Sequence, residues 1–312
     1  MANASVAVGT YAGVAARPYV SAAILAADTI ANGYVSVIEN VHSKAVLRKF
    51  SGAAIQANDD CAFSTPASGQ LTVGEAVLEA AALKVNEQVC NADLRATWES
   101  ALIRSQNDGA PADFVTYTAQ YVAAKVAESV EHNIWHGNFN HTTGATSGAT
   151  YTAFDGLSRH LVDNYAAGNM QQLTGATTAA NILARLADLT AEAPAAIAGD
   201  PNTKLFMSRA MAQLYYQALA ADYSLPFLND GLATRYAGYE IITPGGMPND
   251  TFLLSKGENL YFGTNLLTDH IQASILDLTG VTGDDVTRVI MQFSAGTQVV
   301  DAPSVSFAYR TS

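Results

Sequence analysis

The sequence predicts an α+β fold, in which strands and helices occupy different parts of the chain. Apolar and polar residues alternate at 34–41 and again at 83–89, as they do on half-buried strands. The clearest helical pattern covers 111–136, and most of the sequence after Thr234 has the composition of strands. Strands and helices do not alternate regularly and no internal repeat occurs, so a parallel α/β sheet is not expected.

The composition is that of a folded, acidic protein. Hydrophobic residues make up 49% of the 312 residues and charged residues 14%, whereas disordered chains combine few apolar residues with high charge. The net charge of −12 argues against a surface that grips phosphate backbones, which needs clustered Lys and Arg. No apolar run could span a bilayer and no secretory signal is evident, so we expect a chain of cytoplasmic origin with no membrane partner.

The first 90 residues predict an arm followed by a hairpin. Residues 1–33 have no firm periodicity. In 34–90, two alternating segments flank a stretch rich in Gly, Ser, Asn and Asp, which predicts a long two-stranded hairpin with a polar tip. An isolated hairpin is marginally stable because it has no second layer against which to bury its apolar face. We therefore expect a neighbouring subunit to cover it.

One long helix is expected at 111–136. Pro111 suits its first turn, and Gly137 suits a left-handed residue just past its end. A helix of this length, about 37 Å, needs packing partners on more than one side. The apolar stripe that we expect to pack consists of Val122, Val126, Val130 and Ile134.

The rest of the chain predicts two shorter helices and a series of strands. A helix is expected at 178–192, and a buried strand at 205–207 leads into another helix with Ser208 as its N-cap. The strands expected after Thr234 are 239–243, 251–256, 259–265, 271–278, 286–294 and 305–310.

Three of the six histidines lie within 131–141, which raises the question of a metal site. His132 and His136 stand four residues apart on the expected helix, as in the HExxH motif of zinc proteases. However, the glutamate precedes the first histidine, the helix ends at once, and His141 falls in a loop. Solvated or capping histidines at a helix C-terminus, where positive charge is favoured, are the preferred interpretation, and we expect neither a metal nor another cofactor.

Other chemical motifs give little support for an enzyme. The sequence has no nucleophile elbow, P-loop or dinucleotide-binding glycine motif. Cys61 and Cys90 lie far apart and outside any CxxC spacing, so we expect free thiols, and nothing indicates a role for either.

Three stretches carry a resemblance to a known family. The long helix ends in "IWHGN" at 134–138, and "FDGL" at 154–157 is similar to the glycine-containing turn that follows the corresponding helix in that family. The block 235–269, with "EIITPGGMP" and "NLYFGT", is the most specific in wording. With the order of elements, these stretches resemble the Hong Kong 97-type major capsid proteins of tailed bacteriophages, most of all those of phages that infect Bacteroidetes.

The resemblance implies a division of the chain. Residues 1–33 would be the N-terminal arm and 34–90 the E-loop. The peripheral domain would comprise 91–152 and 294–312, with its spine helix at 111–136, and the axial domain would be 153–293. The E-loop residues implied in contacts between subunits are Lys49, Phe50, Ile55, Phe63 and Leu71.

The resemblance also implies a function. The chain would assemble with itself as hexamers and pentamers into the icosahedral head of a tailed phage, in the host bacterial cytoplasm. It would enclose double-stranded DNA without binding it specifically, and an acidic wall would keep the genome from adhering. Further partners would be a portal protein, decoration proteins and a scaffold protein. Because the chain has no room for a fused scaffolding segment, we expect the scaffold to be a separate protein or one already removed.

Two alternatives and one departure accompany this expectation. The same fold serves encapsulins, which are bacterial compartments that hold cargo enzymes. A metal-dependent hydrolase using His132 and His136 is the alternative from another class. Some capsid proteins of this family cross-link an E-loop lysine to an asparagine of the next subunit, but neither Lys44 nor Lys49 lies in a matching motif, so no covalent cross-link is expected.

Overall fold

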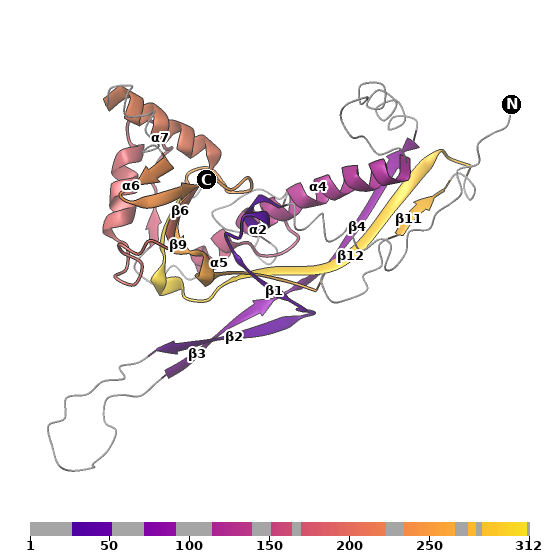
Figure 1. The fold of residues 1–312 in the computed structure, drawn as a ribbon, viewed down its shortest axis with the longest axis horizontal. Coiled ribbons are helices and arrows are strands. Elements are labelled where there is room, and N and C mark those ends of the chain that lie inside the picture. The colour runs from indigo at the N-terminus through magenta and orange to yellow at the C-terminus, as the bar shows by residue number, and fades with distance from the viewer. Residues whose placement is uncertain are drawn as a thin grey trace, which may run out of the picture.

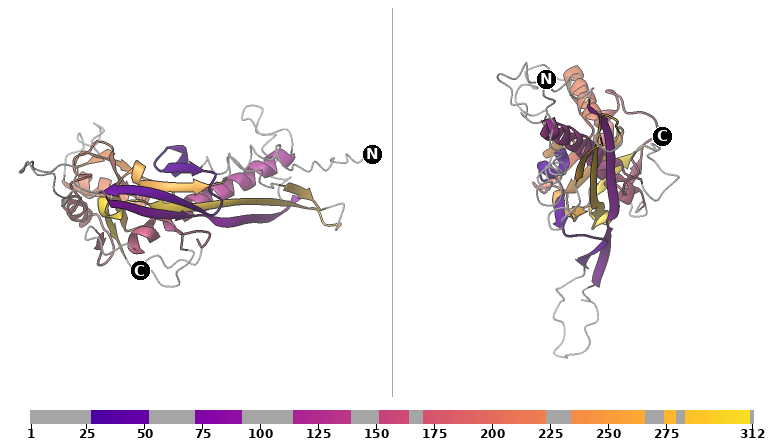
Figure 2. Two further views of the ribbon diagram at one scale, coloured as in Figure 1. Left: turned by 90° about the horizontal axis from the view of Figure 1, so that it is seen from below. Right: turned by 90° about the vertical axis from the view of Figure 1, so that its right-hand side faces the viewer.

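The computed structural model describes residues 27–51, 72–91, 114–138, 151–163, 170–222, 234–265, 274–278 and 283–310. These residues form a five-stranded sheet, a six-stranded sheet and a separate two-stranded hairpin, with helices packed on the two larger sheets (Figure 1). The molecule is elongated, and the hairpin projects away from its body in two perpendicular views (Figures 1 and 2). The α+β class expected from the sequence is confirmed.

The five-stranded sheet is organised around one long strand, β12. One edge of β12 pairs with β4 over ten residues, and the other edge pairs with β11 and then β10, all antiparallel. The outermost strand, β1, runs parallel to β10. The strands are β1 (Ser36–Glu39), β4 (Ala81–Cys90), β10 (Leu260–Thr264), β11 (Ser274–Asp277) and β12 (Val286–Val299).

The long helix α4 (Phe114–His136) lies along this sheet (Figure 1). Its four predicted stripe residues are buried in the larger hydrophobic core, together with residues of β12 and of α5 (Leu157–Asp163). The helix ends at the predicted residue, but the reason given for Gly137 is wrong, because its φ is not positive. A Cβ at Gly137 would lie 2.1 Å from the Phe154 carbonyl oxygen, so the position needs glycine for a close backbone approach.

A buried glutamate joins α4 to the short helix α2 (Asp28–Ala31). Glu131 is only 6% exposed, and its carboxylate accepts hydrogen bonds from the Thr29 backbone N–H at 3.0 Å and the Thr29 hydroxyl at 2.6 Å. The Trp135 indole N–H donates to the same hydroxyl at 2.7 Å. Because a buried carboxylate is costly without such donors, this set of bonds fixes where the N-terminal part of the chain meets the long helix.

The six-stranded sheet forms the other end of the molecule, in the order β5, β13, β9, β6, β8, β7. Its second hydrophobic core lies under two helices, and Ser208 caps the second of them as predicted, since its hydroxyl accepts from the Met211 backbone N–H at 3.3 Å. The elements are β5 (Met170–Gln172), α6 (Ile182–Ala191), β6 (Thr203–Met207), α7 (Arg209–Asp222), β7 (Arg235–Tyr236), β8 (Tyr239–Ile242), β9 (Thr251–Lys256), the 3-10 turns η5 (Gly257–Asn259) and η6 (Ala302–Ser304), and β13 (Ser306–Tyr309).

The last strand does not lie where the sequence placed it. Residues 294–312 were expected to return to the sheet of the long helix. In the structure β13 pairs with β9 and β5 inside the six-stranded sheet, whereas β12 supplies the long-helix sheet up to Val299. Alternation of side chains identified the strand, but alternation does not identify its partner.

The hairpin is also shorter than the sequence indicated. It consists of β2 (Lys44–Ser51) and β3 (Thr72–Glu79), which pair antiparallel over eight residues. The flanking alternating segments, expected in 34–90 as parts of the same hairpin, are β1 and β4 of the five-stranded sheet.

No helix in the described part of the chain is long and apolar enough to cross a membrane.

Candidate assembly surface

The outward face of the hairpin carries exposed apolar residues in cross-strand pairs. Val46 lies opposite Val77, and Phe50 lies opposite Val73. Phe50 is 64% exposed, Val46 54% and Val73 52%, which is unusual for large apolar side chains that share one face. We call these four residues the apolar face of the hairpin.

Charged pairs alternate with the apolar pairs along this face. Lys44 lies opposite Glu79 and forms an ion pair with it at 2.6 Å, and Arg48 lies opposite Glu75. Opposite charges across a strand pair favour this register, but exposed pairs of this kind contribute little to stability. The pairing register of the two hairpin strands is therefore well defined, while the apolar side chains of this face remain exposed to solvent.

Two glycines form the seat on which the hairpin crosses the five-stranded sheet. Gly263 of β10 and Gly296 of β12 are directly opposite each other. A Cβ at Gly296 would lie 2.1 Å from the Glu79 carbonyl oxygen, and a Cβ at Gly263 would lie 2.5 Å from a methyl group of Leu78. Leu78 is fully buried here, so the end of β3 rests directly on the sheet backbone. We call Gly263 and Gly296 the glycine seat.

Polar contacts hold the hairpin in this orientation. Gln298 donates its side-chain N–H to the Val77 carbonyl oxygen at 2.6 Å, and Lys49 forms an ion pair with Asp301. Asp301 is itself held by Asn259, whose amide oxygen accepts from the Asp301 backbone N–H at 2.7 Å. The hairpin is thus joined to the body at its base and partway along β2.

The predicted E-loop residues have different placements. Phe50 is exposed on the apolar face, whereas Lys49 points to the opposite face and pairs with Asp301 of its own chain. Ile55, Phe63 and Leu71 lie outside the described residues, as does Cys61. Cys90, at the end of β4, is an exposed free thiol. The sequence analysis did not single out Val46, Val73 and Val77. Val46 lies four residues before Phe50 and Val73 lies four residues before Val77, so each pair shares one face of its strand, and strand pairing brings the two pairs together.

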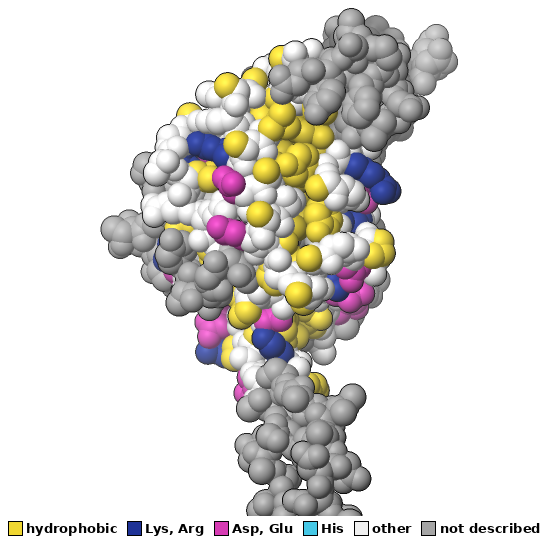
Figure 3. All heavy atoms as spheres, turned by 90° about the vertical axis from the view of Figure 1, so that its left-hand side faces the viewer, with side chains coloured by type: hydrophobic (Ala, Val, Ile, Leu, Met, Phe, Trp, Pro, Cys, Tyr) yellow, Lys and Arg dark blue, Asp and Glu magenta, His cyan; other side chains and the backbone are white. Residues whose placement is uncertain are grey.

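The end of the molecule that carries α6 and α7 has apolar surface of its own. Figure 3 shows hydrophobic side chains gathered in a band on this face, with scattered charged side chains around them. Tyr216 of α7 is 37% exposed, and Leu183 of α6 and Leu214 of α7 are partly buried. This end of the molecule therefore carries a second exposed apolar area, apart from the apolar face of the hairpin.

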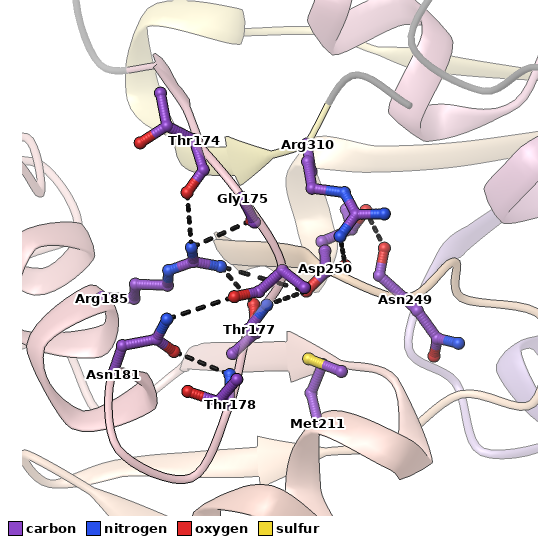
Figure 4. A network of polar contacts seen from close by, with 12 residues as sticks. Thr174, Gly175, Thr177, Thr178, Asn181, Arg185, Met211, Asn249, Asp250 and Arg310 are labelled. Atoms are coloured by element: carbon purple, nitrogen blue, oxygen red, sulfur yellow. Dashed lines mark hydrogen bonds and ion pairs between the residues drawn. The ribbon is translucent and has the colours of Figure 1, made fainter.

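A polar network around Asp250 stabilises this end (Figure 4). The Asp250 carboxylate accepts from the Thr177 backbone N–H at 2.7 Å and forms an ion pair with Arg310 at 3.0 Å. Arg185 donates to the carbonyl oxygens of Thr174 and Gly175 at 2.9 and 3.0 Å. Asp250 has a φ of 55° and is mostly buried, so these bonds hold a strained residue and fix the loop before α6.

The two helical histidines contact an aromatic ring. The rings of His132 and Tyr151 are stacked with centroids 4.8 Å apart, and the His136 ring lies 5.6 Å from Tyr151. Both histidines are half-buried, so they are packing residues more than solvated ones. Within the described ranges no three His, Cys, Asp or Glu side chains are close enough to hold a metal ion, and His141 lies outside those ranges.

The environment of His136 predicts a pH dependence. Burial, and then the nearby His132, lower the pKa of His136 below its usual value near 6.5. The unfolded chain therefore binds the proton more readily, so the free energy of unfolding should fall as pH drops from about 6.5 through the lower folded-state pKa. Urea titrations at pH 7.5 and 5.5 should show a smaller difference for His136→Gln than for the parent chain. An unchanged difference would contradict this assignment.

Comparisons with known proteins were made for the whole chain. No family model and no curated protein matches it. Among solved structures, a chain of the satellite phage P4 procapsid with its size determination (Sid) protein matches with a TM-score of 0.64 and 13% identity, covering 94% of this chain and 90% of that chain. The capsid of a native GTA particle matches with a TM-score of 0.56 and 15% identity, covering 93% and 91%.

A structure of Mycobacterium phage Cain matches as well, with a TM-score of 0.55 and 15% identity, covering 91% of this chain and 90% of that chain. These likenesses extend over almost the full length of both chains, so they concern the whole architecture and not one shared motif. The chain therefore has the fold of phage major capsid proteins, the Hong Kong 97-type fold that its motifs indicated.

Proposed function

We propose that this chain is a major capsid protein that assembles with itself, as hexamers and pentamers, into the icosahedral head of a tailed phage. The observation that carries the proposal is the apolar face of the hairpin, which projects from the body and is exposed in the single subunit. Exposed apolar patches mark surfaces that a protein partner covers. The fold provides independent support, because it is similar to that of chains in a solved phage procapsid and a solved GTA capsid.

The assembled shell would enclose double-stranded DNA without a specific binding site. The net charge of −12 supports this, since an acidic wall repels a phosphate backbone. In this proposal the chain is not an enzyme, its place is the virion, and assembly occurs in the cytoplasm of the host bacterium. A separate scaffold or one already removed, a portal and decoration proteins are proposed partners on the analogy of fold alone.

Negative-stain microscopy of the purified full chain tests the proposal. We expect closed shells built from hexamers as well as pentamers. Shells of pentamers alone would favour the encapsulin alternative, and a chain that stays monomeric at high concentration would contradict the proposal. Metal analysis of the parent chain tests the hydrolase alternative, and we expect no stoichiometric zinc. The His132→Ala and His136→Ala variants should likewise bind no zinc and should assemble as the parent does.

A further inference from the structure

The segment 28–34, which contains α2, contacts both halves of the molecule. One half comprises the five-stranded sheet and α4, and the other comprises the six-stranded sheet with α6 and α7. Toward the first half, Thr29 is bonded to Glu131 and Trp135 of α4. In Figure 1, α2 lies beside the end of α4 that is nearest to the six-stranded sheet. We call residues 28–34 the clasp.

The clasp reaches the other half through two further side chains. The Asp28 carboxylate forms an ion pair with Arg209 of α7 at 2.8 Å. The Tyr34 ring packs edge-on against Phe206 of β6, with centroids 6.1 Å apart, and the Lys204 ammonium lies 5.2 Å from the centre of the Tyr34 ring. One short segment thus contacts α4, α7 and β6, and it joins the two halves to each other.

The loop after β8 meets α4 at the same glutamate. The Gly246 backbone N–H donates a long hydrogen bond to the Glu131 carboxylate, at 3.5 Å. A Cβ at Gly246 would lie 2.1 Å from the Glu131 backbone carbonyl oxygen, so this loop rests directly on the helix. The clasp, α4 and the half with the six-stranded sheet therefore meet at Glu131.

The hydrogen bonds at Glu131 fit one placement of the clasp. The Trp135 indole N–H donates to the Thr29 hydroxyl, whose own proton is then directed to Glu131. The other two partners of the carboxylate in the described structure are backbone N–H groups, so it meets donors at both oxygens. If α2 moved by one residue, Asp28 or Ile30 would face the buried carboxylate, and neither has a hydroxyl to donate.

The apolar contacts between the halves are less specific. The larger hydrophobic core includes Val126 of α4 together with Phe206 of β6 and Phe307 of β13, so it extends across both halves. Such contacts hold two layers together, but they tolerate repacking at a modest cost in free energy. A buried polar network is satisfied in one geometry only, and in some proteins it is the network that specifies a unique arrangement.

We infer that the clasp fixes a single orientation of the half with the six-stranded sheet relative to α4, through the hydrogen bonds of Thr29 and Glu131. Without these bonds, the shared core keeps the halves together but in several orientations. The consequence for assembly rests on the proposed function. A closed shell repeats the same contacts in its copies, so it needs subunits of one shape.

Distances between two spin labels in one chain test the inference. In a background with Cys61→Ser and Cys90→Ser, the labels are attached at Tyr121→Cys of α4 and Tyr216→Cys of α7, which are exposed positions in different halves. Labelled chains are diluted with unlabelled chains, so that pulsed EPR records only distances within a chain. We expect one narrow distribution in this background and a distribution at least about twice as wide after Thr29→Val, which removes only the hydroxyl.

Three controls separate a change of orientation from a general loss of stability. Thr29→Ser keeps the hydroxyl and should keep the narrow distribution. Thr287→Val removes another buried hydroxyl, bonded to Asn91 at 2.6 Å within one half, and should leave the distribution unchanged. Labels at Tyr121→Cys and Val37→Cys, which both lie in the half with the five-stranded sheet, should give the same width with and without Thr29→Val.

An unchanged width after Thr29→Val would overturn the inference, as would equal broadening after Thr287→Val or between the labels in one half. If Thr29→Val does not fold, Glu131→Gln takes its place, because its amide has the shape of the carboxylate but accepts at one end only. An unchanged width there overturns the inference equally.

The same samples separate this inference from the proposed function, because the distances can be measured in shells and in free subunits. Closed shells together with an unchanged width after Thr29→Val would leave the proposed function standing and overturn the role of the clasp. A broadened distribution in a protein whose parent chain forms no shells would support the clasp and contradict the proposed function.

Discussion

Subunits with Phe50→Thr are expected to fold normally and to assemble only at a higher concentration. Phe50 is 64% exposed in the single chain, so its loss should change the free energy of unfolding by no more than about 0.5 kcal/mol. Burying a Phe side chain at a contact contributes about 1.5–3 kcal/mol. Each contact therefore weakens at least about tenfold, and the concentration needed for assembly should rise by that factor or more, measured by light scattering.

The matched control is Val37→Thr. Val37 is also an exposed apolar residue, at 38%, but it lies on β1 and outside the hairpin. We expect this variant to assemble at the same concentration as the parent chain. Assembly of Phe50→Thr at parental concentrations would show that the apolar face of the hairpin is not a contact surface.

The second large effect is expected at the glycine seat. Gly296→Ala would place a Cβ 2.1 Å from a backbone oxygen, which no side-chain rotation relieves. We expect the free energy of unfolding to fall by about 3 kcal/mol, the upper end for overpacked positions, or the hairpin to detach from the sheet. Urea unfolding of the subunit measures the first outcome, and proteolysis within β3 reports the second.

Two further variants control this prediction. Gly74→Ala lies in β3, where the nearest atom to its Cβ would be 3.9 Å away, so it should keep or slightly raise stability. Gly263→Ala meets side-chain atoms, of Leu78 at 2.5 Å and of Val41 at 3.3 Å, so Leu78→Val should relieve part of its cost. The double variant should then lose less stability than the sum of the single variants. Parental stability of Gly296→Ala would contradict the glycine seat.

The positions of several helices and strands could be predicted from the sequence, but the strands with which they pair could not. The cap at Ser208 and the strands around 251–264 follow from residue chemistry within a few positions. The end of α4 was placed correctly, but Gly137 is needed there for the close approach of Phe154, which local sequence does not show. The alternating segment at 83–89 was correctly assigned as a strand but paired wrongly, because its partner β12 lies about two hundred residues later. Periodicity fixes which side chains share a face and says nothing about distant pairing.

The assembly surface shows the same limit. The resemblance named Phe50 as a contact between subunits; the structure places it on the apolar face of the hairpin, and its contact with another subunit stays a prediction. The charge of Lys49 is used within its own chain, because Asp301 comes close to it only after the last strands have folded. Gly263 is part of the motif "NLYFGT". A glycine is needed there because Leu78 of the hairpin packs against it, and this contact exists only where the hairpin crosses the sheet.

A reconstruction of the assembled particle by electron cryo-microscopy tests the central claim most directly. It should show a closed shell in which every copy's hairpin lies on another copy and Val46, Phe50, Val73 and Val77 are buried. Particles in which this face is open to solvent, or a chain that remains a monomer with the face exposed, would contradict the account.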